Sequence, residues 1–286
     1  MFQEKARAKI NLTLEILGKR DDGYHELRSL VAFADFGDEL SFTPDNNFSL
    51  TISGPFATDL VGENLIRKAA DFFQARKPGT SSGHFHLKKN LPVASGIGGG
   101  SADAAAALRL LLKSTDLPHS ILNPSVIAKQ LGADIPVCLE QNPVLMTGIG
   151  EHLSTLENFP ALPAVLINPA VPVSTGAIFR NLNARPLPSD ISALNTCNER
   201  LTSQQDILLY MATHKNDLQP IAAELEPVIS DVLSTLEKQS GCQIARMSGS
   251  GATCFGIFES SHKAEIASAE IQSNHPDWWI QHCKIQ

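Results

Sequence analysis

Four glycines fall within five positions, Gly96 to Gly100, in the run Pro92-Val-Ala-Ser-Gly-Ile-Gly-Gly-Gly-Ser-Ala-Asp103. An alanine-rich segment with the pattern of a helix follows from Ser101. Glycine lets the backbone adopt positive φ and approach a ligand closely, and the free N–H groups of a helix start attract anions. The run therefore predicts a loop that holds phosphate. A tight turn without a ligand is the alternative, but it would not require so many glycines.

Two familiar nucleotide-binding loops fit the run poorly. No Gly-Lys-Ser/Thr ends it, so it is not a Walker A loop. The dinucleotide pattern lacks its third glycine, where Ser101 stands, and the acidic residue at the expected distance, Asp116, lies in a polar loop before a proline. A dinucleotide-dependent oxidoreductase is therefore a remote alternative.

Three other short segments carry residues that could do chemistry: Ala8-Lys9-Ile-Asn11-Leu, Leu131-Gly-Ala-Asp134-Ile-Pro136 and Met247-Ser-Gly-Ser-Gly251. Taken singly, each has an ordinary explanation. A lysine on a strand is usually solvated, an Asp two residues before Pro is a common helix cap, and two glycines between strands form a hairpin turn. For the last segment, the hairpin and a functional role stay equally open.

In this order along the chain, the four segments resemble the GHMP kinase superfamily. Two further segments, Arg20-Asp-Asp-Gly-Tyr24-His25 and Glu63-Asn-Leu-Ile66, are similar to those members that phosphorylate a cytidine diphosphate methylerythritol in non-mevalonate isoprenoid synthesis. The resemblance covers nearly the whole chain. It implies transfer of a phosphoryl group from ATP, with Mg²⁺, to the 2-hydroxyl of that sugar alcohol. Another superfamily kinase, such as homoserine kinase, and a non-catalytic family member remain alternatives.

The resemblance also implies roles for individual residues. Asp134 would accept or orient the hydroxyl proton, and Lys9 would stabilise the carboxylate and a developing alkoxide. Asn11 would position the substrate hydroxyls. Cytosine would stack between Tyr24 and Phe179 and bond to His25. Two residues, Asn168 and Thr175, are candidates to line the erythritol and diphosphate region.

For the nucleotide, the resemblance places Asn64 and Leu65 beside adenine, with Lys89 as a further candidate. The phosphate loop would comprise Pro92, Val93, Ala94, Ser95, Gly96, Ile97, Gly98, Gly99, Gly100, Ser101 and Ala102. Family members often carry a second serine where this chain has Ala102, so one hydroxyl contact to phosphate or metal is lost. Asp103 keeps a carboxylate in the first helical turn, where the helix dipole favours it. No protein ligand of Mg²⁺ is identified.

Composition limits the partners. The 286 residues carry a net charge of −7, a poor match for nucleic acid or an anionic membrane surface. The sequence shows no signal peptide and no apolar run long enough to span a membrane. Five scattered cysteines without a Cys-x-x-Cys pair favour reduced thiols. We therefore expect a cytoplasmic protein, monomeric or homodimeric, that binds small molecules.

The order of expected strands and helices that must position these residues predicts an α+β fold. Strands are expected over 10–16, 24–33 and 39–43, and helices over 203–214 and 226–239, whereas 183–200 shows no regular pattern. His84 and His86 are predicted to lie on an exposed strand rather than to bind metal. A polar, proline-containing stretch predicts two domains, residues 1–160 (ATP-binding) and 161–286. The resemblance implies a ribosomal protein S5 domain 2-like fold for the first and a ferredoxin-like GHMP domain for the second.

Overall fold

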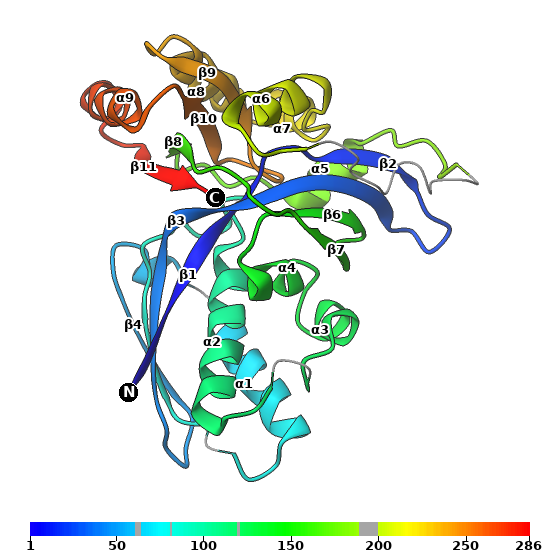
Figure 1. The fold of residues 1–286 in the computed structure, drawn as a ribbon, viewed down its shortest axis with the longest axis vertical. Helices are drawn as coiled ribbons and strands as arrows, with labels where there is room; N and C mark the ends of the chain where they lie inside the picture. Colours follow the sequence, from blue (N-terminus) through cyan, green and yellow to red (C-terminus); the bar gives the residue numbers. More distant parts are fainter. Residues whose placement is uncertain (61–63, 81, 119–120, 189–199) are drawn as a thin grey trace. The chain divides into compact units, whose positions relative to one another are not determined.

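The computed structural model describes residues 1–60, 64–80, 82–118, 121–188 and 200–286. They form two compact units, each assembled from separate stretches of the chain (Figure 1). Unit 1 contains residues 1–9, 36–93 and 98–141, and unit 2 contains residues 10–35, 94–97 and 142–286. Both units combine helices with sheet, which confirms the α+β class. The predicted boundary at residue 160 divides the sequence into two continuous segments, whereas each unit is made of several stretches. This boundary stays a prediction.

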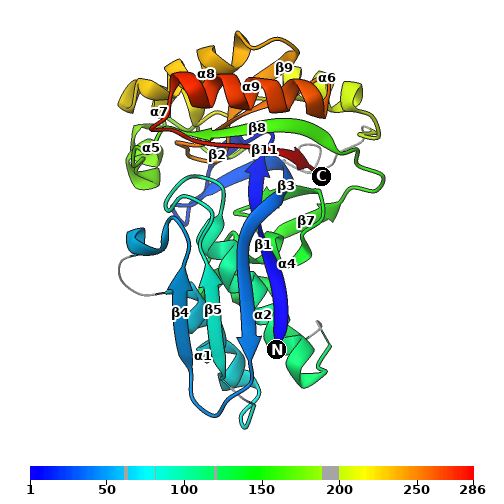
Figure 2. The same ribbon diagram turned by 90° about the vertical axis from the view of Figure 1, so that its left-hand side faces the viewer.

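In unit 1, helices cover one face of a sheet (Figure 2). Its strands are β1 (Phe2–Asn11), the later part of β3 (His25–Thr43), β4 (Ser49–Ser53) and β5 (His84–Lys88). β5 pairs antiparallel with β3 and parallel with β4. Along β5, Phe85 and Leu87 are buried while His84, His86 and Lys88 lie nearer solvent. This alternation is expected of a sheet with one covered face.

Two of the four described α-helices in unit 1 begin at a capping asparagine. The four are α1 (Leu65–Arg76), α2 (Gly99–Thr115), α3 (Pro124–Gln130) and α4 (Ile135–Glu140), with a short 3₁₀ turn, η1 (Ala57–Asp59). Asn64 caps α1 by accepting from the Ile66 N–H at 2.8 Å, and Asn123 caps α3 in the same manner. The alanines of α2 are fully buried, and α1 packs along it.

Unit 2 contains an antiparallel group in the order β11-β8-β10-β9, with helices α8 and α9 packed on it (Figure 2). A second group consists of β2, the first part of β3, β6 and β7. The strands are β2 (Glu15–Lys19), β6 (Val144–Gly148), β7 (His152–Thr155), β8 (Leu162–Asn168), β9 (Cys242–Met247), β10 (Cys254–Phe258) and β11 (Trp279–Ile285). The helices are α5 (Thr175–Asn181), α6 (Gln204–Thr213), α7 (Gln219–Leu225), α8 (Val228–Glu237) and α9 (Ser261–Asn274).

Several predicted elements need correction. The strand expected over 10–16 is wrong as a half-buried strand: β1 ends at Asn11, and both Asn11 and Thr13 are buried. Their polar groups are satisfied inside, because Asn11 donates to the Ser29 hydroxyl and Thr13 accepts from the Leu30 N–H. The polar residues therefore do not mark a solvent face there.

The two strands expected over 24–33 and 39–43 form a single long strand, β3. A Cβ at Gly37 would lie only 2.1 Å from the Ala6 carbonyl oxygen, so this glycine lets β3 pass β1 closely instead of breaking the strand. β6, β7 and α7 were not predicted. Of the irregular stretch 183–200, residues 189–199 lie outside the described part of the chain.

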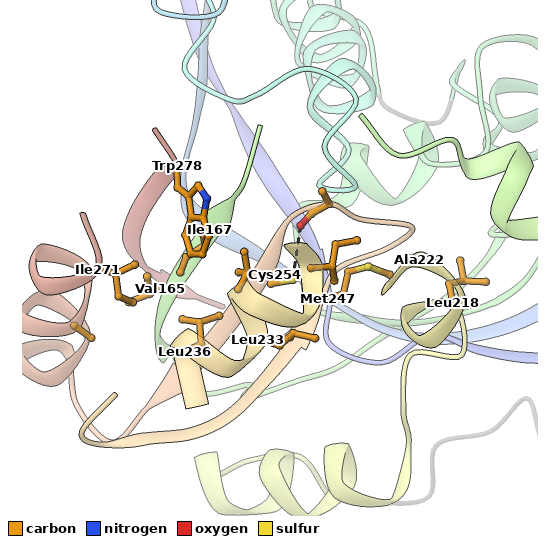
Figure 3. Close-up of a cluster of buried hydrophobic side chains, with 14 of the residues drawn as sticks. Val165, Ile167, Leu218, Ala222, Leu233, Leu236, Met247, Cys254, Ile271 and Trp278 are labelled. Carbon is orange, nitrogen blue, oxygen red and sulfur yellow. Dashed lines mark hydrogen bonds between the residues drawn. The ribbon is translucent and has the colours of Figure 1, made fainter. Parts of the chain in front are cut away.

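The core of unit 2 lies between the sheet and α8 and α9 (Figure 3). Val165 and Ile167 from β8, Leu236 from α8 and Ile271 from α9 contribute to it, and Leu236 is completely buried. Throughout the described residues, no helix has both the length and the apolar character needed to cross a bilayer.

We expect Leu236→Ala to lower the free energy of unfolding by about 2–5 kcal/mol, because it removes buried methyl groups and leaves a cavity. Urea denaturation followed by circular dichroism and by tryptophan fluorescence measures this change. Leu209→Ala on α6 is the matched control: its side chain is 63% exposed, so its effect should stay within about 0.5 kcal/mol. Equal losses for both variants would contradict the placement of Leu236.

Candidate active site

The glycine loop has the backbone conformation of an anion-binding turn. Alternate residues adopt left-handed φ, with 51° at Ala94, 77° at Gly96 and 65° at Gly98. Left-handed residues of this kind occur in turns whose N–H groups bind anions. Gly98 is the N-cap of α2 and no side chain caps this helix. The N–H groups of its first turn therefore face a position suited to phosphate.

The second glycine-rich run lies directly against this loop within unit 2. The Ser248 hydroxyl donates to the Gly96 carbonyl at 3.2 Å and accepts from the Asn11 N–H at 3.1 Å. A Cβ at Gly96 would lie 2.6 Å from the carbonyl oxygens of Ser248 and Gly251. The run is a turn between β9 and β10, and it also packs against the glycine loop at Gly96. Sequence reasoning did not single out Ser248, because no local pattern distinguishes a buried serine with two backbone partners.

The two residues expected to act on the hydroxyl meet within unit 1. The Lys9 ammonium on β1 lies 3.2 Å from the Asp134 carboxylate, and the side chains are 5% and 43% exposed. Asp134 stands at the N-cap of α4 but makes no capping hydrogen bond. The stem of Lys9 lies against the start of α2, since a Cβ at Gly98 would be 3.2 Å from Lys9 Cε. A base, a cation and a helix N-terminus therefore meet in one unit.

Two of the three residues expected to hold the base come together in unit 2. The rings of His25 and Phe179 have centroids 5.0 Å apart. Tyr24 has a side chain that is 61% exposed and has no described contact with Phe179. Partial burial, together with the charge of Lys19, lowers the pKa of His25. The imidazole is thus biased toward the neutral form, which has one donor and one acceptor nitrogen.

The remaining substrate candidates have partners within the protein. Asn11 donates to the Ser29 hydroxyl at 2.8 Å, and Asn168 donates to the Thr253 hydroxyl at 2.9 Å. Thr175 is hydrogen-bonded to Ser250, at the tip of the second glycine turn. These contacts fix Asn11 and Asn168 in buried positions, whereas Thr175 lies near solvent.

Around the expected adenine position, Asn64 uses its side chain as the cap of α1, and Leu65 lies 3.4 Å from where a Cβ at Gly100 would be. Leu65 therefore lies beside the phosphate loop. On the outer face of the sheet, His84 and His86 bond to the hydroxyls of Ser49, Thr51 and Ser53. In the part of the chain that the structure describes, no three His, Cys, Asp or Glu side chains gather as a metal site.

Comparison with known proteins agrees with these features. Residues 64–141 match the family model for the GHMP kinases N terminal domain, and residues 194–277 match GHMP kinases C terminal. A protein of Rhodopseudomonas palustris named 4-diphosphocytidyl-2-C-methyl-D-erythritol kinase is 46% identical over 98% of this chain and 95% of its own. One of the same name from Methylobacterium radiotolerans is 45% identical over 98% and 97%.

The chain is a GHMP kinase. A crystal structure of 4-(cytidine 5'-diphospho)-2C-methyl-D-erythritol kinase matches with a TM-score of 0.78 and 28% identity over 99% of both chains. A homoserine kinase from Cytophaga hutchinsonii shares the fold, with a TM-score of 0.70 and 18% identity over 97% of this chain and 93% of its own. As a GHMP kinase, the protein uses ATP to phosphorylate a small molecule.

Lys89 has a different environment from the other nucleotide candidates of this GHMP kinase. Its ammonium lies 2.5 Å from Asp38 and 2.7 Å from Asp103, and its side chain is 2% exposed. Asp38 also accepts from the N–H groups of Asn90 and Leu91. Lys89 Nζ would be 3.2 Å from a Cβ at Gly99. The lysine thus supports the start of α2 from inside the unit.

The expectation for Asp103 is corrected. It lies beyond the first turn of α2, and its carboxylate pairs with Lys89 instead of facing the helix dipole. Its Oδ1 atom is buried without a hydrogen-bond partner. Burial raises the pKa of Asp103 to about 8, although Lys89 acts in the opposite direction. Burial lowers the pKa of Lys89, but the charges of Asp103 and Asp38 outweigh this and the net shift is upward.

The raised pKa of Asp103 predicts a pH dependence of stability. The folded protein keeps a proton that the unfolded chain releases near its usual carboxyl pKa, so the free energy of unfolding falls as pH rises between about pH 4 and about pH 8. Asp103→Asn is neutral at every pH and should lose this fall, about 1–3 kcal/mol relative to wild type. Urea titrations at several pH values measure it. Asp71→Asn, on the exposed face of α1, should keep the wild-type slope, and an unchanged slope in Asp103→Asn would refute the assignment.

Proposed function

We propose that this GHMP kinase transfers the γ-phosphoryl group of ATP to the 2-hydroxyl of 4-diphosphocytidyl-2-C-methyl-D-erythritol, releasing ADP. The observation that carries the proposal is the Lys9–Asp134 pair, in which the Lys9 side chain lies against Gly98, the residue before α2. The names of relatives 45% and 46% identical over nearly the full chain support the choice of substrate.

The chemistry follows from this pair. The Asp134 carboxylate accepts the proton of the 2-hydroxyl while the hydroxyl oxygen forms a bond to the γ-phosphorus. At the same time, the bond from that phosphorus to the β-phosphate oxygen breaks. The Lys9 ammonium stabilises negative charge on the attacking oxygen and on the transferring group. The uncapped N-terminus of α2 holds the phosphates.

The base of the substrate would be recognised in unit 2. Phe179 and Tyr24 offer aromatic faces for stacking, which any base can accept. Selectivity for cytosine therefore falls to His25, which lies beside Phe179 and whose lowered pKa favours the neutral ring. Such an imidazole can donate to one atom of the cytosine edge and accept from another.

Adenine would lie near Asn64 and Leu65, next to Gly100. Mg²⁺ is held through few protein oxygens and several phosphate oxygens and waters in enzymes of this kind. The ion would enter with ATP and be held mainly by phosphate oxygens and waters. When bound, the ion would neutralise phosphate charge. Free thiols at the four described cysteines accord with a cytoplasmic location, which we also propose.

The substrate proposal is tested by measuring ADP release with three alcohols: the cytidine diphosphate substrate, homoserine and mevalonate. We expect turnover with the first alone, because only that substrate has a base for His25 and Phe179 to contact. Turnover with homoserine or mevalonate but not with the cytidine compound would refute the proposal, and no turnover with any of the three would favour a non-catalytic role.

We expect Asp134→Asn to reduce kcat by about 10²–10⁴-fold, because the amide cannot accept the hydroxyl proton. ATP binding, measured by calorimetry, should change by less than about three-fold, since the N-terminus of α2 is intact. Glu140→Gln, an exposed residue at the other end of α4, is the control and should keep wild-type kcat. If kcat of Asp134→Asn stays near wild type, Asp134 does not act on the proton.

A further inference from the structure

Lys9 and Asp134 belong to elements far apart in the sequence, and Asp134 begins a helix of only six residues. A helix this short is not stable alone, so its direction depends on tertiary contacts. The distance between the ammonium and the carboxylate therefore depends on whatever holds α4 against β1.

Arg109, on α2, connects these two elements. Its Nε donates to the Glu4 carboxylate on β1 at 3.3 Å, and its Nη1 donates to the Cys138 carbonyl on α4 at 2.8 Å. The residue is 7% exposed. A second connection runs from the Gln141 side chain, just after α4, to the Lys5 carbonyl at 2.9 Å.

These connections place the two ends of the elements. Glu4 and Lys5, early in β1, are connected to Cys138 and Gln141, toward the end of α4, whereas Lys9, later in β1, pairs with Asp134 at the start of α4, so the strand and the helix run in roughly opposite directions. The guanidinium is planar and rigid, and it contacts both elements at once. It therefore fixes the position of α4 along β1, and Lys9 and Asp134 lie at the far end of the same pair of elements.

We infer that Arg109 is a positioning residue for phosphoryl transfer: by holding the Glu4 carboxylate and the Cys138 carbonyl, it sets the separation of Lys9 and Asp134. The inference rests on the proposed role of that pair. Arg109 touches neither member of it and acts through the two elements that carry them.

The environment of Arg109 argues for a requirement beyond filling space. Burial lowers its pKa, against the opposing charge of Glu4, and its Nη2 atom is buried without a hydrogen-bond partner. An apolar side chain of similar volume would avoid both penalties, because replacing buried ionic groups by hydrophobic ones is often neutral or stabilising. Such a side chain could not connect a carboxylate on β1 with a carbonyl on α4.

Lys113 provides a matched control. It lies one turn further along α2 and pairs with the other oxygen of the same Glu4 carboxylate, but its side chain is 55% exposed and Glu4 is its described partner. Lys113→Met therefore removes a positive charge from Glu4 without removing the contact with Cys138.

We expect Arg109→Met to lower kcat by at least about ten-fold, because a displacement near 1 Å at the reacting groups has effects of that order or larger. KM for ATP should stay within about two-fold, since Lys89 and the glycine loop are untouched. A crystal structure of the variant should show the Lys9–Asp134 separation lengthened beyond its present 3.2 Å. Lys113→Met should match wild type in all three measurements.

An unchanged Lys9–Asp134 separation in Arg109→Met, or a kcat equal to that of Lys113→Met, would overturn the inference. If Arg109→Met does not fold, Arg109→Lys decides: it keeps a cation but can hold only one of the two partners, so an intermediate kcat supports the inference and a wild-type kcat overturns it. The Lys9–Asp134 separation in the crystal structure of the variant tests the inference whichever alcohol the enzyme phosphorylates. Failure of the wild type to use the cytidine compound would therefore refute the proposed function alone, and kinetics would continue on the alcohol it does phosphorylate.

Discussion

The proposed active site depends on the close approach of the Lys9 side chain to the backbone at Gly98. A Cβ at this position would lie 3.2 Å from Lys9 Cε, so the lysine stem would have to shift, and the φ of 65° at the same position independently favours glycine. This one contact places a cation beside the free N–H groups of α2. Because the ammonium also reaches Asp134, the same side chain locates the proposed proton acceptor relative to the glycine loop.

Much of the fold could be predicted because its signals are local. Asn64 and Asn123 predict helix starts through hydrogen bonds made within three residues, and the alternation in β5 follows from one covered face. The errors arise where distant residues decide the outcome. Gly37 continues a strand because β1 passes close to it, and Asn11 is buried because Ser29 and Ser248 satisfy it. Such partners cannot be identified from neighbouring sequence.

The candidate site likewise contains residues that the sequence identifies and residues that it does not. The glycine loop, Lys9 and Asp134 stand in short segments that the family resemblance identifies, and the structure brings the latter two together. Lys89, Asp38 and Asp103 form a buried charged group that the sequence did not predict, since Asp103 was expected in the first helical turn. A carboxylate near a helix start can be stabilised either by the helix dipole or by a buried cation. The interior position of Asp103 gives it Lys89 as its partner, because a buried carboxyl group without a partner is costly.

The segment Asp134-Ile-Pro136 explains why an ordinary helix cap was a reasonable expectation and why the carboxylate is nevertheless available to pair with Lys9. A capping Asp accepts from the N–H of the second or third helical residue, and it normally has extended backbone angles. Here the second helical residue is Pro136, which has no N–H, and Asp134 has helical angles, φ −82° and ψ −10°. Both features weaken capping while the proline still favours the helix start. The same three residues therefore begin α4 and leave the Asp134 carboxylate to pair with Lys9, so the start of the short helix and the availability of this carboxylate are consequences of one local sequence.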